Sequence, residues 1–380
     1  MLNKIKFKNY KSFKNQQELE LKPMTVVIGK NNSGKSSIVK LPTLIENSLE
    51  GKFPEPLLLK NHGVELGSEF KDIVFGRTRT GSLSLGLQDD HETLDLIIAS
   101  ETGTNDLPKI FSWKLQNSSG QFQKDDKDLF KGFKPQDQEG DCVIKSLQLN
   151  TEYIGPFRAL PERGYTRPNT YTINKLGITG ENAYQLLIQD SLIREQPLIK
   201  KISNWCRDNF EGWELKVNQD KDPFFQIELT RDSGALNINL KDVGQGISQA
   251  LPLITRAYMP ASDEILIIIE QPELHLHPSA HGDLAELFVN SVKEGNKRYL
   301  IETHSQNFIL RLRRLVAEKK FDQEHLLIYF VDFDDENGTS NLIKIEVDEL
   351  GEVNHWPENV FNESLDEALA IRIAQKKKTA

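Results

Sequence analysis

The sequence predicts an α/β fold built on a mixed sheet, and three stretches carry this prediction. In residues 25–39, a short apolar run leads into a loop between two glycines and then a helix pattern. Residues 265–270 are five aliphatic residues followed by an acid, which is typical of a fully buried parallel strand. Residues 299–305 form another apolar run that leads to a histidine. Such strands bring their polar ends together at the carboxyl edge of the sheet, where open α/β sheets bind ligands.

Composition sets the outer limits of the interpretation. The chain has 380 residues, of which 38% are hydrophobic, enough for one large domain or two ordinary ones. Cys142 and Cys206 lie far apart without metal-ligand spacing, so we expect neither a disulfide framework nor a zinc site. No signal segment or membrane-spanning run is present, which predicts a cytoplasmic protein. With a net charge of −9, nucleic-acid binding requires a local basic patch.

The loop after the first strand matches a phosphate-binding motif. Gly29 and Gly34 bracket four residues and Lys35-Ser36 opens a helix, which satisfies G-x-x-x-x-G-K-[ST]. Backbone N–H groups and the helix N-terminus converge on a β-phosphate, Lys35 reaches the β and γ oxygens, and the Ser36 hydroxyl binds Mg²⁺. The flanking strand and helix patterns argue against a chance match in a turn. The predicted nucleotide-binding residues here are Gly29, Lys30, Asn31, Asn32, Ser33, Gly34, Lys35, Ser36 and Ser37.

The first half of the chain is predicted to contain mostly sheet. Basic and apolar residues alternate over 2–21, which predicts an opening hairpin. Its lysines form either a solvated face or a phosphate-binding face. Strand spacing returns at 72–75 and 82–87, whereas the polar residues of 116–141 predict a surface excursion on the sheet.

The middle of the chain is predicted to be a turn followed by helices. Residues 153–163 end a strand in a glycine- and proline-containing turn that carries two arginines. Apolar residues then follow at helical spacing over 182–210, with a break at Pro197. We expect a helical insertion at approximately 178–212. No heptad pattern is long enough for a coiled-coil arm.

Three motifs in the second half are expected to complete a nucleotide site. Glu270 ends the buried acid strand and is the expected acid on the Mg²⁺ side. The turn around Gly244, Gly246 and Ser248 enters an apolar helix and can present backbone N–H groups to a phosphate. His304 follows a strand. Each signal is weak alone, but their order along the chain makes them reinforce one another.

At these residues the chain resembles the ABC-type ATPase heads of the RecF, SMC and OLD group. Within that group it is similar to bacterial ATPases often encoded beside anti-phage nucleases, including the Septu ATPase. The motifs are Walker A at 29–36, a signature turn at 244–249, Walker B and the D-loop region at 270–278, the switch histidine at 303–305 and the family-like ending at 354–361.

The resemblance covers most of the chain and implies one ATPase head over 1–380, with an N-terminal β subdomain. It implies ATP and Mg²⁺ as cofactors. It also implies that the signature turn of a second head completes each site, so we expect a homodimer or a higher oligomer.

One residue departs from the pattern of this group. Related heads usually place a glutamate after the strand acid, whereas this chain has Gln271. A neutral amide can orient water but cannot accept its proton, which predicts slow hydrolysis assisted by Glu273 or His304. Alternatively, the register is shifted and Glu270 performs both roles. The candidate catalytic residues are therefore Glu270, Gln271, Glu273 and His304, and the candidate metal ligands are Ser36 and Glu270.

The expected function is slow ATP hydrolysis that controls a protein effector such as a nuclease, or a DNA or RNA transaction, in anti-phage defence. A non-hydrolysing, nucleotide-gated scaffold is the alternative that Gln271 supports. An OLD-like nuclease would need an acidic cluster, but Asp332–Asp335 leads into Asn337-Gly338, a hairpin-turn signal. A predicted helix carries Arg311, Arg313 and Arg314. These residues either contact nucleic acid or form a solvated helix face. We expect no membrane partner.

Overall fold

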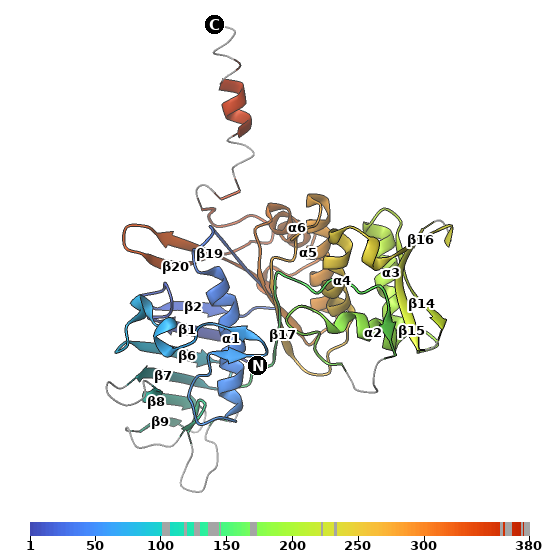
Figure 1. Ribbon diagram of the computed structural model, residues 1–380. Helices are drawn as coiled ribbons and strands as arrows, with labels where there is room; N and C mark the ends of the chain where they lie inside the picture. The colour runs from blue at the N-terminus through green and yellow to red at the C-terminus, as the bar shows by residue number, and fades with distance from the viewer. Residues whose placement is uncertain are drawn as a thin grey trace.

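A six-stranded sheet runs through the centre of the computed structural model in the order β12-β17-β18-β3-β19-β20 (Figure 1). Neighbouring strands are parallel except for the antiparallel pair β19 and β20, so the sheet is mixed, as predicted. The strands are Thr151–Ile154 (β12), Ile265–Glu270 (β17), Lys297–Glu302 (β18), Met24–Gly29 (β3), Leu326–Asp334 (β19) and Thr339–Ile345 (β20). The structure describes residues 1–100, 107–117, 120–124, 130–135, 144, 146–167, 173–221, 223–231, 234–357, 360–361, 367–373 and 375.

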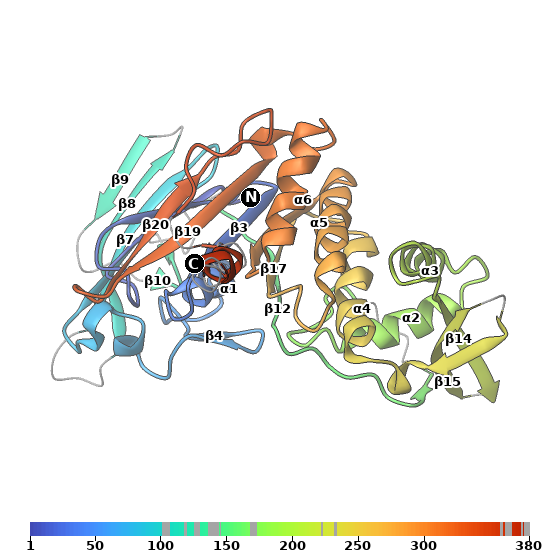
Figure 2. The same ribbon diagram turned by 90° about the horizontal axis from the view of Figure 1, so that it is seen from above.

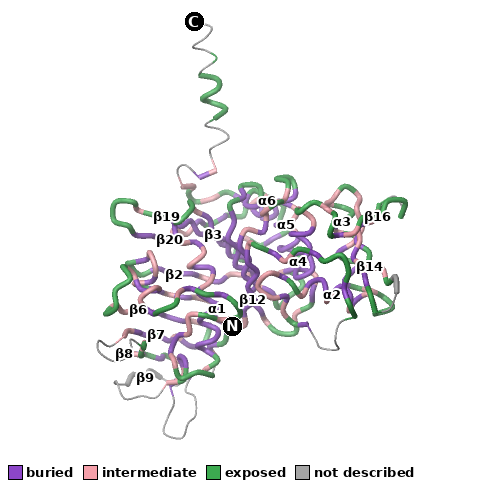
Figure 3. Tube along the Cα trace, in the orientation of Figure 1, coloured by how far each residue is buried: buried purple, intermediate pink, exposed green. Residues whose placement is uncertain are grey.

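The central strands are apolar along their length because both faces of the sheet are covered. Every residue of β17 is buried, and successive residues face opposite sides. Ile265, Ile267 and Ile269 pack into one core, whereas Leu266 and Ile268 pack into the other. Figure 3 shows these strands as a buried band through the middle of the molecule.

Helix α1 (Lys35–Glu50) lies between the central sheet and a second, antiparallel sheet (Figure 1). The second sheet is the predicted N-terminal β subdomain and has the order β2-β1-β6-β7-β8-β9. Ile38, Leu41 and Ile45 of α1 share one core with both sheets, so this helix is covered from two sides. The strands are Gln17–Glu20 (β2), Lys4–Lys8 (β1), Ser82–Gln88 (β6), Thr93–Ser100 (β7), Pro108–Asn117 (β8) and Gly120–Lys124 (β9).

Three helices cover the opposite face of the central sheet (Figure 2). They are α4 (Gln245–Tyr258), α5 (Pro278–Lys293) and α6 (Gln306–Ala317). Each contributes apolar residues to the core that receives Ile267 of β17, among them Leu253, Leu284 and Phe308. No helix in the described part of the chain is both long and apolar enough to cross a bilayer.

A smaller unit packs beyond α4 and contains the two helices that were expected over 182–210. These are α2 (Asn182–Ser191) and α3 (Pro197–Asn209), and Pro197 is the first residue of α3, where its missing N–H costs no hydrogen bond. A sheet lies beside them, made of Tyr165–Thr166 (β13), Glu214–Lys221 (β14), Phe224–Arg231 (β15) and Leu236–Asn239 (β16). That this region is an insertion into the head stays a prediction.

The prediction of a strand over 72–75 is wrong. The chain there forms two short 3-10 helices, Phe70–Asp72 and Phe75–Arg77. One Asp72 carboxylate oxygen accepts the backbone N–H groups of Ser68 and Glu69, at 3.0 and 3.1 Å. Such local side-chain bonds to the backbone compete with strand pairing and favour a turn.

The described part of the expected excursion over 116–141 contains the end of β8, all of β9 and a small hairpin of Phe130–Lys131 (β10) and Lys134–Pro135 (β11). Residues 118–119, 125–129 and 136–141 lie outside the described residues, so the excursion stays a prediction. A further short hairpin pairs Lys60–Asn61 (β4) with Val64–Glu65 (β5).

The acidic cluster Asp332–Asp335 lies at the turn of the β19–β20 hairpin, as predicted. Asp334 Oδ1 accepts the backbone N–H groups of Glu336 and Asn337, at 2.9 and 3.2 Å. The Asp334 carboxylate therefore stabilises the turn. Among the residues that the structure describes, no three His, Cys, Asp or Glu side chains are grouped so that they would hold a metal by themselves.

Candidate functional site

The predicted phosphate-binding loop follows β3 at the carboxyl edge of the central sheet and leads directly into α1. Two of its glycines are required by close approach and backbone geometry. At Gly29, a Cβ would lie 2.7 Å from the Val331 carbonyl oxygen of β19. Gly34 has a φ of +102°, and its Cβ would lie 2.8 Å from Ser12 Oγ. Side chains at either position would therefore deform the loop.

Neighbouring elements hold the loop in place. The Ser340 hydroxyl on β20 donates to the Ser33 carbonyl oxygen at 2.7 Å, and the Tyr10 hydroxyl donates to the Ser37 carbonyl oxygen at 2.8 Å. The loop residues that remain exposed are Lys30, Asn31 and Asn32. Ser33 is fully buried, and its own hydroxyl has no hydrogen-bond partner. The supported loop thus leaves its tip open to a ligand.

The first two residues of α1 turn their side chains toward the site. Lys35 is buried and donates from Nζ to the Lys30 carbonyl oxygen at 2.6 Å, inside the loop. Burial lowers the pKa of Lys35, while the Glu302 and Glu270 carboxylates oppose the shift. The Ser36 hydroxyl donates to Glu302 Oε2 at 2.8 Å. A cation and a hydroxyl donor therefore stand at the helix N-terminus, where phosphate binding is favoured.

The facing wall of the site is an acid edge, by which we mean Glu270, Gln271, Glu273 and Glu302. Glu270 and Glu302 end the adjacent strands β17 and β18 in matched register, and both are buried. Glu270 Oε1 lies 3.5 Å from Lys40 Nζ of α1. Burial raises the pKa of Glu270, and Lys40 opposes this shift. Burial and the neighbouring Glu270 charge raise the pKa of Glu302 to about 7.

Glu273 and His304 also meet at this edge. Glu273 Oε1 accepts the backbone N–H of His304 at 2.6 Å, while its buried Oε2 has no hydrogen-bond partner. Burial raises the pKa of Glu273. His304 Nε2 lies 4.0 Å from Glu302 Oε1, and the side chain is 35% exposed. Burial and the Lys35 charge lower the pKa of His304, so the ring is mainly neutral at neutral pH.

Gln271 has a left-handed backbone conformation, with a φ of +46° that few non-glycine residues adopt. Two hydrogen bonds hold it there. Its N–H donates to the Glu302 carbonyl oxygen at 2.8 Å, and its carbonyl oxygen accepts Arg158 Nη2 at 3.0 Å. The same Nη2 donates to the Glu270 carbonyl oxygen at 2.7 Å. Arg158 therefore supports the backbone of both residues.

Arg158 also connects the acid edge to α4. The Gln249 side chain accepts the Arg158 backbone N–H at 3.2 Å and donates to its carbonyl oxygen at 3.1 Å. Arg158 is 5% exposed, and its Nε and Nη1 have no hydrogen-bond partner. The helix that begins at the predicted signature turn is thereby tied to the backbone of Glu270 and Gln271.

The predicted signature turn lies apart from the phosphate loop of its own chain. Gly244 is exposed, and a Cβ there would meet nothing within 4 Å. Gly246 approaches the segment after β17, and its Cβ would lie 3.2 Å from the His275 carbonyl oxygen. Ser248 is buried and donates from Oγ to the Gln245 carbonyl oxygen at 3.1 Å. No hydrogen bond or ion pair joins 244–248 to 29–37, both of which are fully described.

The oxygen atoms at the edge fit a magnesium ion. Mg²⁺ prefers hydroxyl and carboxylate oxygens, and it commonly takes one or two carboxylates together with substrate phosphates. Ser36, Glu270 and Glu302 supply such donors. Glu270 Oε1 is buried without a hydrogen bond and already lies 3.5 Å from one cation, the Lys40 ammonium, which shows that this edge accepts positive charge. The residues present therefore fit the predicted metal.

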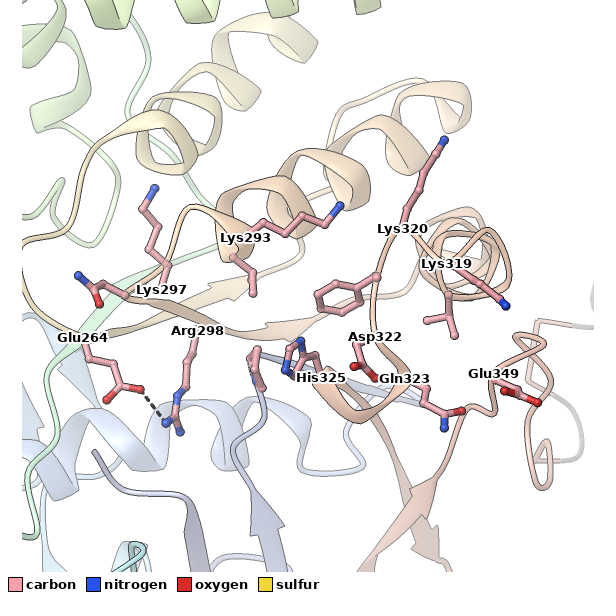
Figure 4. A pocket seen from close by; sticks show the side chains of 15 residues that line it. Glu264, Lys293, Lys297, Arg298, Lys319, Lys320, Asp322, Gln323, His325 and Glu349 are labelled. Carbon is pink, nitrogen blue, oxygen red and sulfur yellow. Dashed lines mark ion pairs between the residues drawn. The ribbon is translucent and has the colours of Figure 1, made fainter.

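The candidate site at the phosphate loop is distinct from a cavity of about 850 Å³ at the other end of the strands (Figure 4). Its lining includes Pro23, Glu264, Lys297 and His325, which stand at the starts of β3, β17, β18 and β19. Lys297 Nζ donates a hydrogen bond to the Ala257 carbonyl oxygen at 2.7 Å. The cavity thus lies at the amino edge, opposite the loop.

The arginines proposed for nucleic-acid contact are on α6, and each already has an ion pair or a hydrogen bond within the chain. Arg311 pairs with Asp283 at 3.1 Å and Glu286 at 2.7 Å. Arg313 donates to the Gly351 carbonyl oxygen at 2.7 Å, and Arg314 pairs with Glu318 at 3.1 Å. In the N-terminal hairpin, Lys4 and Lys6 pair with acids of β2. These contacts favour the solvated-face interpretation of both basic groups.

Two residues of the site were missed from the sequence. Glu302 ends a buried apolar strand, which is the same signal that identifies Glu270 and could have revealed it. Arg158 was noted only as one of two arginines in a turn, because its partners are the backbone atoms of residues 112 and 113 positions away. The predicted Ser36, Lys35, Glu270, Glu273 and His304 do lie at the same edge of the sheet.

Comparisons with known proteins agree with this geometry. A family described as AAA ATPase domain matches residues 1–155 and 185–309. The ATP/GTP phosphatase of Helicobacter pylori (strain ATCC 700392 / 26695) is 26% identical over 342 residues, which cover 84% of this chain and 90% of that protein.

Similar solved structures are SMC heads. The SMC head domain from Thermotoga maritima is 14% identical, with a TM-score of 0.42, and the match covers 91% of this chain and 99% of that one. The Smc head domain with an extended coiled coil, bound to the C-terminal domain of ScpA and derived from Pyrococcus furiosus, is 12% identical, with a TM-score of 0.47, over 98% and 99%.

The family match includes the phosphate loop, the signature turn, the acid edge and His304. It confirms that the chain is an ATPase-type domain, and the chain belongs to the AAA ATPase domain family.

Proposed function

We propose that this chain binds ATP with Mg²⁺ at the phosphate loop and hydrolyses it slowly. The observation that supports this most strongly is the juxtaposition of Lys35 and Ser36 with buried acids at the ends of β17 and β18, where the Ser36 hydroxyl meets Glu302 at 2.8 Å. One wall is cationic and rich in N–H donors, and the other is anionic. Mg-ATP carries both the phosphate charge and the cation that such a pair of walls requires.

The residues divide the work between binding and chemistry. The loop N–H groups and Lys35 bind the β and γ phosphates, and Ser36 with the edge acids holds Mg²⁺. When bound, Mg²⁺ neutralises charge that develops on the phosphates. Gln271 orients the attacking water through its amide but cannot accept a proton. Glu273 is the favoured candidate base, because its Oε2 is buried without a hydrogen bond and its raised pKa makes the carboxylate more basic.

Slow turnover follows from this division. The candidate base, Glu273, is two residues further along the chain than Gln271, whose amide orients the water, so proton transfer is less direct than with a glutamate at position 271. His304, mainly neutral at neutral pH, is available to bond a γ-phosphate oxygen. Phosphoryl transfer depends chiefly on positioning and charge stabilisation, so hydrolysis still proceeds.

A second copy of the chain completes the site. The Gly244 turn is exposed and makes no bond to the phosphate loop of its own chain, so it is available to a γ-phosphate on another head. ATP with Mg²⁺ should therefore promote or tighten dimerisation. The cleanest test is Gly244→Asp, because a side chain there meets no atom of its own chain, whereas one at Gly246 approaches the His275 carbonyl oxygen.

In sedimentation experiments, wild type should shift to a dimer or a tighter assembly with Mg-ATP, and Gly244→Asp should abolish the shift while keeping ATP affinity. If the variant keeps both the shift and normal phosphate release, the composite site is wrong.

The closed dimer is proposed to control a protein effector such as a nuclease, in the setting of anti-phage defence that the sequence resemblance implies. A protein is favoured over DNA or RNA because the candidate arginines of α6 are already paired. Purification of the native complex and identification of its components tests this. Recovery of nucleic acid alone would favour the DNA or RNA alternative.

The central test is Lys35→Ala, with Lys293→Ala at the opposite edge as its matched control. Calorimetry should show ATP binding to wild type and to the control but not to Lys35→Ala. This variant lacks the ammonium group that would contact the β- and γ-phosphate oxygens. Equal affinity for ATP in all three proteins would show that the phosphate loop does not bind ATP.

A non-hydrolysing, nucleotide-gated scaffold is the second candidate, and the neutral amide at Gln271 is the observation in its favour. Phosphate release under single-turnover conditions separates the two. Release that is abolished by Lys35→Ala supports hydrolysis, whereas tight ATP binding without release supports the scaffold.

A further inference from the structure

The face of α1 that turns toward the acid edge carries two polar side chains, one helical turn apart. Ser36 and Lys40 are four residues apart, so they lie on the same side of the helix. The Ser36 hydroxyl donates to Glu302 Oε2 at 2.8 Å, and the Lys40 ammonium lies 3.5 Å from Glu270 Oε1. One helix face thus reaches the acids that end both β18 and β17.

Glu270 and Glu302 require positive charge beside them. Both are buried and in register on adjacent strands, which lie about 4.8 Å apart, so their negative charges repel each other. Burial raises the pKa of both carboxyl groups, and the Lys40 charge opposes this shift in each. Lys40 therefore stabilises the ionised form of the acid edge, which is the form that binds a cation.

Lys40 is free to leave its place beside Glu270. Its side chain is 26% exposed, whereas that of Glu270 is 7% exposed. Glu270 Oε1 makes no hydrogen bond, so the contact with Lys40 depends on charge alone. The ammonium also lies 5.8 Å from the centre of the Tyr153 ring, whose face attracts cations. Solvent and the Tyr153 ring thus offer a second position to this flexible side chain.

We propose that Lys40 is an exchangeable counter-charge, which neutralises Glu270 in the nucleotide-free head and gives up this carboxylate when Mg-ATP binds. The inference rests on the proposed function and keeps Glu270 as the acid on the Mg²⁺ side. Lys40 and the metal then compete for one carboxylate, so the ion pair lowers the affinity for Mg²⁺. Removal of the Lys40 charge should therefore tighten metal binding, whereas loss of a merely structural contact would weaken it.

The test uses Lys40→Met, which removes the charge but keeps the length of the side chain, with Lys4→Met as a matched control. Lys4 also pairs with an acid, Glu18 at 3.3 Å, and is 27% exposed, but it lies in the N-terminal hairpin. For each protein, the affinity for a fluorescent ATP analogue is measured at a fixed Mg²⁺ concentration and in EDTA. The ratio of the two affinities is the Mg²⁺-dependent gain.

Lys40→Met should increase this gain by about 3- to 10-fold, because the metal no longer has to displace an ion pair that has one buried partner. Lys40→Arg keeps the cation and should not increase the gain, and the Lys4→Met control should stay within about 1.5-fold of wild type. The inference is overturned if Lys40→Met leaves the gain unchanged or lowers it, or if Lys40→Arg raises it equally. Should Lys40→Met not fold, Lys40→Gln takes its place with the same expectation.

A double-mutant cycle with Glu270→Gln tests whether the competition is for this carboxylate. Glu270→Gln should itself lower the gain, and adding Lys40→Met should then change the gain by less than about twofold. A retained gain in Glu270→Gln, or an undiminished effect of Lys40→Met in that background, would also overturn the inference. If wild type binds no analogue in either buffer, the proposed function fails instead.

Discussion

The phosphate loop and the acid edge face each other across the same site, but they are held together in different ways. The loop is a single continuous stretch, and Lys35 bonds within it, to Lys30. The acid edge is assembled from β17, β18, the turn that contains Arg158, and α4. One wall is therefore a single stretch that Ser340 and Tyr10 support from outside, whereas the other wall is itself built from segments that are distant in the sequence.

The two walls also differ in charge and exposure. The loop leaves Asn31 and Asn32 in solvent, whereas Glu270 and Glu302 are buried side by side. Each wall alone carries groups without adequate partners, since Lys35 is a buried cation with a lowered pKa and the acids have raised pKa values. We therefore expect nucleotide binding to depend mainly on the loop and the chemical step mainly on the acid edge, so the effects of changes in each wall should be separable.

The largest expected effect is an increase in the rate of ATP hydrolysis when one residue of the acid edge is changed. Gln271→Glu should raise the single-turnover rate by about 10²- to 10⁴-fold, because a general base then lies beside the oriented water. ATP affinity should not rise with the rate, since the new carboxylate near Glu270 repels the γ-phosphate. If the rate is unchanged while Glu273→Gln or Glu270→Gln abolishes it, the register assigned to Gln271 is wrong and one of those acids is the base.

The second prediction concerns pH and the nucleotide-free protein. The pKa of Glu302 rises from 4.5 to about 7 on folding, so the folded state binds more protons between these values. Its stability should therefore fall as pH rises through this window, by up to about 3 kcal/mol from this group. Urea unfolding at pH 5 and pH 8 should show a smaller fall in Glu302→Gln than in wild type. An identical fall in both proteins would mean that Glu302 ionises normally.

A smaller effect is expected from Arg158→Met, with the exposed Arg207→Met as its control. Loss of the bonds to the Glu270 and Gln271 carbonyl oxygens should cost about 1.5 to 3 kcal/mol, or roughly 10- to 100-fold in the chemical step. ATP affinity should stay within about threefold, because the loop is untouched. Single-turnover kinetics and equilibrium binding measure the two quantities. Equal losses in both would show that the walls are not separable.

The smallest expected effect is a difference in stability between two glycine variants, Gly34→Ala and Gly244→Ala. Gly34→Ala should destabilise the protein by about 1 to 3 kcal/mol, because of its positive φ and the close approach of Ser12. Gly244→Ala should cost less than about 1 kcal/mol, since its φ is −55° and no atom lies near the new methyl group. Urea unfolding without nucleotide measures both. Similar losses in the two variants would argue that the loop is no more constrained than the signature turn.

Much of the site could be predicted because its signals are local. The phosphate loop is nine consecutive residues, and the strand that ends in Glu270 is a continuous aliphatic run. The interpretation failed at 72–75, where apolar residues at strand spacing form 3-10 turns, because the Asp72 side chain bonds the backbone just before it. Periodicity alone does not reveal that competition.

The amino-acid sequence by itself determined the fold class, the phosphate loop, the acid that ends β17 and the histidine that follows β18. Only the tertiary structure decided which acid faces the loop. Ser36 and Glu302 are 266 residues apart, and they meet because β18 pairs between β3 and β17 in the observed register. Strand order and register come from the packing of both faces of the whole sheet, to which distant segments contribute, so no local pattern records them.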